Sequence, residues 1–220
     1  LEKNNSFKLN ALNYIQNNID TIIFILKNNN YIDKSLNLTD KSMVAMQLQE
    51  LHSLVIADLY DKFNSFRDLT DIQLVGLFSM FTNISIANDE KMNVPYCNDP
   101  INKKLALKVN DYLNKYYDIE CQYELDTGCE YTIHYELIDY MKEWCDACDE
   151  VACKNLIIKI KKEKDIFLGE FVKAILKINN IATEFEKVCE LLQNLNLLQK
   201  IKNIPKLTMK YIVTNQSLYI

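Results

Sequence analysis

The chain has 220 residues, of which 49 % are apolar, so it is long enough for one sizeable domain with a hydrophobic core. Only three glycines and three prolines occur, which favours long helices and excludes a turn-rich β-sandwich. The net charge of −5 and a sequence pI of about 5.2 exclude a uniformly basic nucleic-acid binder, so any RNA contact must come from a local basic strip.

The N-terminal segment predicts one helix followed by a short hairpin. Apolar residues recur at spacings of three and four over residues 7–28, namely Leu12, Ile15, Ile19, Ile22 and Leu26. Three asparagines then end the helix, because asparagine favours turns. Two short extended pieces, at 31–32 and 36–38, flank a polar turn. We therefore interpret residues 1–38 as the end of a preceding winged-helix-like segment and 39–220 as a helical bundle.

Residues 39–81 predict two helices with separate start signals. Thr39 is a good N-cap, and Asp40 follows it in the first turn, where a negative charge complements the helix dipole. This helix is expected to run to about residue 59, with a possible break at His52-Ser53. Thr70 and Gln73 have the spacing of a capping box, which predicts a second helix with Leu74, Leu77, Phe78 and Phe81 on its buried face.

The remaining segments are also mostly helical by their apolar spacing. We predict a loop over 87–98, helices over 101–117, 132–148 and 151–162, and the longest helix over 166–192; residues 118–128 remain ambiguous. Pro205 is expected to interrupt the tail before a last segment at 206–220. The prediction is an all-α bundle of about seven to nine helices, with a possible small winged-helix remnant at the N-terminus.

Three blocks of sequence resemble the C-terminal helical (DSHCT) domain of superkiller-type DExH-box RNA helicases. The first runs from Leu38 to Phe81 and is similar to the family's L-T-x-K-G-R and D-L-T-x-x-Q-I-V-A-L-L-S-x-F wording. The second, from Tyr135 through Trp144-Cys145, resembles H-E-L-M-x-x-V-Y-x-W-C. The third runs from Gly169 to Ile220, and its ending matches at Lys210, Ile212, Val213, Ser217, Leu218, Tyr219 and Ile220. Together the blocks cover most of the chain.

The resemblance implies a role in RNA metabolism. In these helicases the C-terminal bundle packs against two ATP-driven motor domains, and one of its helices lies along the single strand as a ratchet. The enzymes unwind RNA and deliver it to a degrading exosome. Since the chain contains no G-x-x-x-x-G-K-S/T loop, ATP and Mg²⁺ are expected in motor domains outside it, and this piece alone is expected to be non-catalytic. It begins with Leu1, so we expect it to be cut from a longer protein.

The resemblance places the family's basic RNA-facing positions on Lys173 and Lys177. They are four residues apart and so share one helix face. The family has arginine at both positions, whereas lysine keeps the attraction for phosphate and loses planar stacking on bases. The family glutamate before the glycine is Leu168 here, and an acidic residue expected near the RNA is replaced by Ser85. The alternative interpretation of both lysines is the solvated face of an amphipathic helix.

A denser basic run contains Lys159, Lys161, Lys162 and Lys164. It has the charge to follow a phosphate backbone. Glu163 and Asp165 interrupt it, so a solvated segment without RNA contact is the alternative. Arg67 is the only arginine in the chain, so bidentate recognition of phosphate by arginine is scarce.

The other candidate residues point to structural roles. Cys145 and Cys148, with Cys153, invite a zinc interpretation, but no second pair has a zinc-module spacing, and we expect buried cysteines on a helix face. His52 and His134 lack partners at catalytic spacing, so no catalytic residue is assigned. Trp144 lies on an apolar stripe, which favours core packing over base stacking.

Partners and location follow from the same observations. We expect single-stranded RNA, motor domains of the same polypeptide and an exosome or its adaptors as partners. Seven cysteines, an odd number, without a signal peptide indicate a reducing compartment, either cytoplasmic or nuclear, and a viral source in a host cytoplasm is possible. No apolar run approaches a membrane span of about 20 residues. The acidic pI leaves a rival open, a helical protein-interaction scaffold that binds no nucleic acid.

Overall fold

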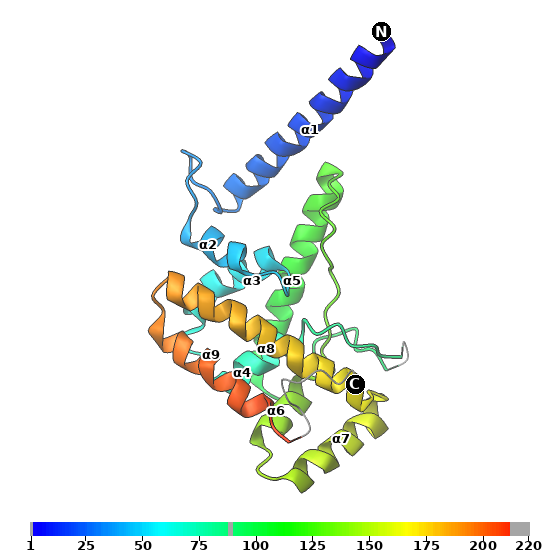
Figure 1. The fold of residues 1–220 in the computed structure, drawn as a ribbon, viewed down its shortest axis with the longest axis vertical. Coiled ribbons are helices and arrows are strands. Elements are labelled where there is room, and N and C mark those ends of the chain that lie inside the picture. Colours follow the sequence, from blue (N-terminus) through cyan, green and yellow to red (C-terminus); the bar gives the residue numbers. More distant parts are fainter. Residues whose placement is uncertain (1, 88–89, 212–220) are drawn as a thin grey trace.

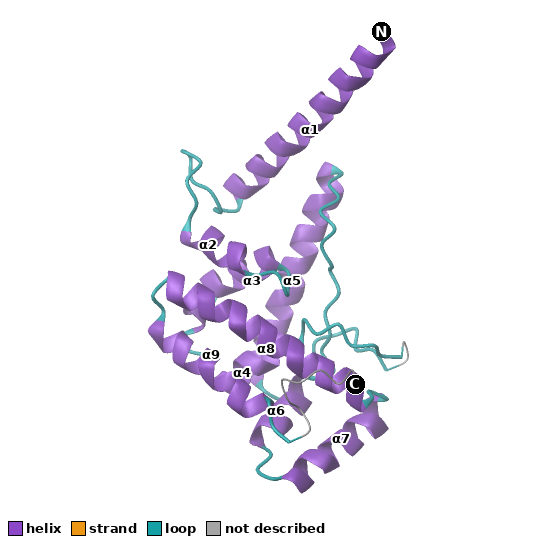
Figure 2. Ribbon diagram, in the orientation of Figure 1, coloured by secondary structure: helices purple, strands orange, loops and turns teal. Residues whose placement is uncertain are grey.

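A computed structural model describes residues 2–87 and 90–211, and its architecture is helical throughout (Figures 1 and 2). Within these ranges there are nine α-helices, one 3₁₀ turn at Asn64–Phe66 and no strand, which confirms the predicted all-α class. The α-helices are α1 Glu2–Asn28, α2 Asp40–Gln47, α3 Ser53–Lys62, α4 Asp71–Ser79, α5 Pro100–Tyr123, α6 Ile138–Asp146, α7 Glu150–Lys164, α8 Leu168–Leu191 and α9 Leu195–Thr208. No helix in the described ranges is long and apolar enough to cross a membrane.

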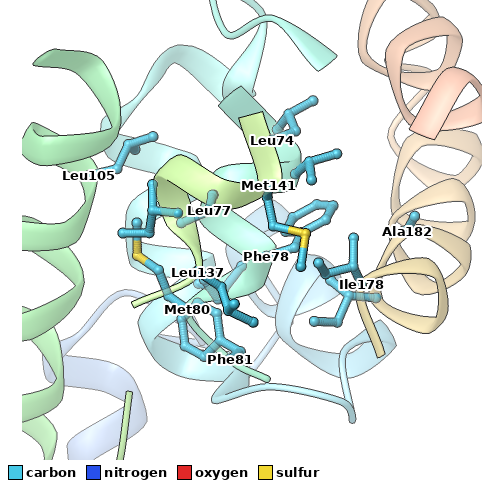
Figure 3. Close-up of a cluster of buried hydrophobic side chains, with 14 of the residues drawn as sticks. Leu74, Leu77, Phe78, Met80, Phe81, Leu105, Leu137, Met141, Ile178 and Ala182 are labelled. Carbon is cyan, nitrogen blue, oxygen red and sulfur yellow. The ribbon is translucent and has the colours of Figure 1, made fainter. Parts of the chain in front are cut away.

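Helix α4 lies at the centre of the bundle, and its residues 74–79 are all buried. It contacts α5, α6, α8 and α9. Figure 3 shows Leu74, Leu77 and Phe78 of α4 meeting Leu105 of α5, Met141 of α6 and Ile178 of α8. All six side chains are fully buried. Burial of large apolar side chains at about 1.5–3 kcal/mol each makes this cluster the main source of stability.

Two predicted helix starts are confirmed in atomic detail. The Thr39 side chain accepts a hydrogen bond from the Ser42 N–H at the start of α2. At α4, the Thr70 hydroxyl accepts from the Gln73 N–H at 3.1 Å, and the Gln73 side chain accepts from the Thr70 N–H at 3.0 Å. The possible break at residues 52–53 is real, since α2 ends at Gln47 and His52 caps α3.

Helix α1 extends away from the bundle (Figure 1). Its predicted apolar stripe therefore lies largely at the surface, with Ile15, Ile19 and Ile22 exposed, while the Leu12 side chain lies outside the described ones. The predicted hairpin after it consists of one isolated antiparallel bridge between Ile32 and Leu38. The assignment of residues 1–38 to a winged-helix-like segment stays a prediction.

A buried ionic cluster ties the base of α1 to the bundle. Asp58 of α3 pairs with Lys41 of α2 and, at 3.2 Å, with Lys115 of α5. The Tyr116 hydroxyl donates to the same carboxylate at 2.7 Å and lies 3.2 Å from the Tyr31 hydroxyl, just after α1. The cluster therefore joins the segment after α1 to α2, α3 and α5 around the buried Asp58.

Two predicted boundaries are wrong, and a third segment is now resolved. Residues 132–137 are not helical, and α6 starts only at Ile138. The His134 N–H instead donates to the Met80 carbonyl at 2.9 Å, residues 133–137 are all buried, and the Ile138 N–H closes a turn on the Tyr135 carbonyl. Pro205 lies inside α9 instead of interrupting the tail. The ambiguous stretch continues α5 as far as Tyr123, where Glu124 adopts a left-handed conformation that ends the helix. The residues predicted after position 211 lie outside the described ranges.

Candidate nucleic-acid interface

Helix α8 positions the two candidate lysines, because its apolar stripe fixes which face is buried. Phe171, Ile175, Ile178 and Phe185 are buried as predicted. The opposite face carries Lys173, whose side chain is 64 % exposed, and Lys177, whose side chain is 26 % exposed. The two lysines therefore share one outer face of α8. At 24 residues α8 equals α5 and is shorter than α1, which has 27, so the prediction that it is the longest helix is wrong.

Each lysine lines a hollow beside α8. We call the first the Lys177 cleft; its volume is about 490 Å³, and its walls include Lys177, Glu50, His52, Phe81, Asn83 and Glu130. The second, the Lys173 cleft, has a volume of about 430 Å³ and is lined by Ser85, Ala87, Asp165, Phe167, Gly169, Glu170 and Lys173. The segment that follows α4 contributes to both, with Phe81 and Asn83 in one and Ser85 and Ala87 in the other. The clefts are thus successive along one edge of α8.

Carboxylates accompany both lysines. Lys173 Nζ lies 2.8 Å from Glu170 Oε1, and Lys177 Nζ lies 3.1 Å from Glu50 Oε2. The hydrogen bond from Lys173, together with one from the Ser85 N–H at 3.1 Å, lowers the pKa of Glu170, so this carboxylate is ionised at neutral pH. The surface beside the two lysines is therefore mixed in charge and not uniformly positive.

The loop between α2 and α3 lies directly on α8. The backbone N–H groups of Gln49 and Glu50 both donate to Glu184 Oε2, at 3.0 and 3.1 Å. The Asn180 side chain donates to Glu50 Oε1 at 3.3 Å. These contacts fix the loop over the outer face of α8, next to Lys177.

The lysines of the basic run in α7 have different neighbours in the structure. Lys159 reaches toward α6, where its Nζ lies 2.8 Å from Glu143, and it lines a separate cleft with Glu136, Asp139 and Glu163. Lys161 lies over the ring of Phe167, which lines the Lys173 cleft, and it also pairs with Asp165 at 3.1 Å. Lys162 is exposed. Lys161 is thus close to the Lys173 cleft through Phe167 and Asp165; whether any of the three contacts RNA stays a prediction.

The cysteines and Trp144 have core or surface positions. Trp144 is fully buried against Phe171 and donates to the Thr208 carbonyl at 2.9 Å, as predicted for a core residue. Burial raises the pKa of the Cys145 thiol to about 12, which keeps it protonated. Cys148 is exposed beyond the end of α6, so the predicted sharing of an apolar helix face by Cys145 and Cys148 is wrong. In the described ranges no three His, Cys, Asp or Glu side chains are grouped to hold a metal ion.

The sequence interpretation missed the acidic side of this interface. Glu50 and Glu184 approach each other only through the tertiary fold, so no local pattern reveals them. Glu170 follows Gly169 directly, and its spacing of three from Lys173 on a predicted helix was a usable signal for an ion pair.

The family described as the DSHCT (NUC185) domain matches residues 35–216, which is most of the chain and includes α2 to α9. No curated protein matches the sequence. Helix α1 lies before the matched range. By this match the chain belongs to the DSHCT domain family.

Proposed function

We propose that this domain guides single-stranded RNA along the outer face of α8 as the C-terminal module of a superkiller-like, ATP-dependent RNA helicase. The observation that carries the proposal is that Lys173 and Lys177 line two successive clefts which share the segment after α4 as a wall. Family membership supplies the helicase context. ATP and Mg²⁺ are bound by motor domains outside this chain, which itself has no catalytic residue in the proposal.

The chemistry of the clefts favours contact with phosphates over contact with bases. Lysine offers a flexible point charge, and the neighbouring carboxylates limit the local positive field. Each phosphate neutralised on a single strand contributes a slope of about −0.7 to the dependence of log affinity on log salt. We therefore expect weak, sequence-independent binding that is lost steeply as salt rises.

The test is charge reversal of the two lysines. Lys173→Glu with Lys177→Glu is expected to lower the affinity of the chain for a fluorescein-labelled single-stranded RNA by about tenfold or more at low salt, since two phosphate contacts become repulsive. Fluorescence anisotropy measures this. In the helicase that carries the domain, the same variant should lower RNA-stimulated unwinding.

A matched control is available on α9. Lys202 and Lys206 are also four apart and exposed, so Lys202→Glu with Lys206→Glu makes the same change in net charge on another helix. This control should keep most of the affinity. Equal losses in both variants would mean a non-specific charge effect and would remove the proposed role of α8.

A second function is favoured by a separate observation. Helix α1 exposes Tyr14, Ile15, Ile19, Ile22 and Phe24, a large apolar surface for a helix that protrudes from the bundle (Figure 1). Such a surface suits a protein contact, so we propose that the domain also braces the motor domains through α1. Delivery of RNA to an exosome is the step that this arrangement would serve. If the domain binds protein through α1 and shows no affinity for RNA, it is the helical protein-interaction scaffold of the rival hypothesis.

A further inference from the structure

The loop between α2 and α3 covers part of the face on which we place the RNA. Its contacts to α8 are made at Lys177, Asn180 and Glu184, which are spaced by three and four residues and therefore lie on one stripe of the helix. Glu50 supplies the carboxylate to Lys177 and also accepts from Asn180. The Lys177 ammonium is consequently paired with an acid from a different part of the fold.

The two lysines differ in this respect. The Glu170 partner of Lys173 lies three residues earlier on α8 itself, and the Lys173 side chain remains 64 % exposed. Lys177 is only 26 % exposed, and its partner sits on a loop that two backbone N–H bonds hold to Glu184. A strand that approaches α8 therefore meets a largely exposed Lys173 paired within its own helix, and a less exposed Lys177 paired with a carboxylate from another part of the fold.

We propose that Glu50 is an internal competitor of RNA for Lys177, so that the α2–α3 loop restrains strand binding at the Lys177 cleft. This inference rests on the proposed function of α8. A carboxylate and a phosphate oxygen make the same kind of hydrogen bond to an ammonium group, so only one of them occupies a given N–H. An ion pair at a partly exposed site is weak, and a phosphate therefore displaces Glu50 when other contacts hold the strand nearby.

The arrangement makes strand engagement sequential. Lys173 exchanges its Glu170 partner for a phosphate with the loop in place, whereas Lys177 binds the strand when Glu50 leaves it. A movement of the α2–α3 loop away from α8 would raise the affinity for the RNA strand, and return of the loop would lower it. The α2–α3 loop would thus regulate RNA affinity, although it lies outside the α8 face that carries Lys173 and Lys177.

The test is Glu50→Gln in the full chain. Glutamine keeps an oxygen for the Asn180 amide and removes the charge that holds Lys177, while the backbone bonds to Glu184 remain. Affinity for a fluorescein-labelled 20-nucleotide oligouridylate is expected to rise about threefold to tenfold at low salt. The slope of log affinity against log salt should steepen by about 0.7, the value for one additional phosphate contact. Glu190→Gln, an equal charge change at the far end of α8, should alter neither quantity beyond a small common shift.

A double-mutant cycle assigns the effect to Lys177. Lys177→Gln should lower the affinity less in the parent chain, where Glu50 competes for the ammonium, than in the Glu50→Gln background, where it should abolish the gain. Equal gains from Glu50→Gln and Glu190→Gln would overturn the inference, as would a large loss from Lys177→Gln alone with no gain from Glu50→Gln. In that last case the proposed function still stands, whereas loss of the effect of Lys173→Glu with Lys177→Glu would remove the function itself.

Discussion

At the scale of single residues, His52 caps α3 with a neutral ring nitrogen and is buried, so its protonation at low pH should destabilise the fold. Its Nδ1 accepts the Val55 N–H at 3.4 Å and so caps α3. Its ring is buried beside those of Tyr116 and Tyr131, at centroid distances of 5.7 and 5.1 Å. Because Nδ1 accepts a hydrogen bond, the neutral ring carries its proton on Nε2. Protonation of Nδ1 would remove the cap and place a charge in this aromatic environment.

Acid should therefore weaken the fold in the range where histidine titrates. Burial lowers the pKa of His52 below its ordinary 6.5, and burial lowers that of His134 as well, with Glu136 opposing the effect. The unfolded chain then binds more protons than the folded chain below about pH 7, so stability is lost as pH falls from 7 toward 5. Each buried histidine contributes a slope of at most about 1.4 kcal/mol per pH unit.

The variant that checks this is His52→Asn. Asparagine retains an N-cap acceptor and does not titrate, so the pH dependence of the urea midpoint between pH 7.5 and 5.5 should become shallower, with the His134 contribution remaining. Parallel curves for the parent and the variant would show that His52 is not the titrating group.

At the scale of elements, the contact between α4 and α5 depends on Gly76. A Cβ at this position would overlap the side chain of the buried Asn102. Alanine normally stabilises a helix interior by about 1 kcal/mol relative to glycine. Here the overlap should outweigh that gain, so Gly76→Ala is expected to destabilise the domain by about 1–3 kcal/mol.

Gly169, in the first turn of α8, is the matched control. Nothing lies within 4 Å of a Cβ built there, so Gly169→Ala should be neutral or slightly stabilising in the same denaturant titration. In an Asn102→Ala background the penalty of Gly76→Ala should largely disappear. A stabilising Gly76→Ala would contradict the close approach of α4 and α5.

How far the elements follow from sequence depends on whether their signals are local. Helix α4 was predictable from its capping box and α8 from its regular apolar stripe, because each of these signals lies within the segment itself. Pro205 was misinterpreted because burial of Ile201, Ile204 and Thr208 outweighs its break in the hydrogen-bond ladder of α9. Residues 133–137 are all buried, so neither a helical nor an alternating pattern describes them.

The candidate site divides in the same way. The exposure of Lys173 and Lys177 on one helix face follows from the stripe of α8, which is local. The pairing of Lys173 with Glu170 is local too, whereas the pairing of Lys177 with Glu50 arises only when α2 packs on α8. Ion pairs between residues far apart in the sequence follow no local pattern. The mixed charge of the interface could therefore be identified only from the fold.

At the scale of the whole molecule, the two candidate lysines and the exposed apolar stripe of α1 lie on separate elements. The ion pairs of Lys173 and Lys177 lie along α8 in the bundle, whereas α1 carries exposed aromatic and aliphatic side chains away from it (Figure 1). The base of α1 is held by the buried Ile25 and by Tyr31, whose hydroxyl donates to the Leu54 carbonyl at 2.7 Å. The protruding part of α1 therefore contributes little to the stability of the bundle.

This separation predicts that α1 binding and bundle stability respond independently to substitution. Ile15 and Ile19 are 55 % and 45 % exposed, so Ile15→Asp with Ile19→Asp should change the free energy of unfolding by only about 0.5 kcal/mol per site. Association with the motor domains, measured by sedimentation velocity, should be lost because two charges enter an apolar interface. Val151→Asp on α7, at a position 66 % exposed, is the control and should leave association intact. If the α1 variant binds the motor domains as tightly as the parent chain, the bracing contact lies elsewhere on the bundle, and the exposed stripe of α1 serves another partner.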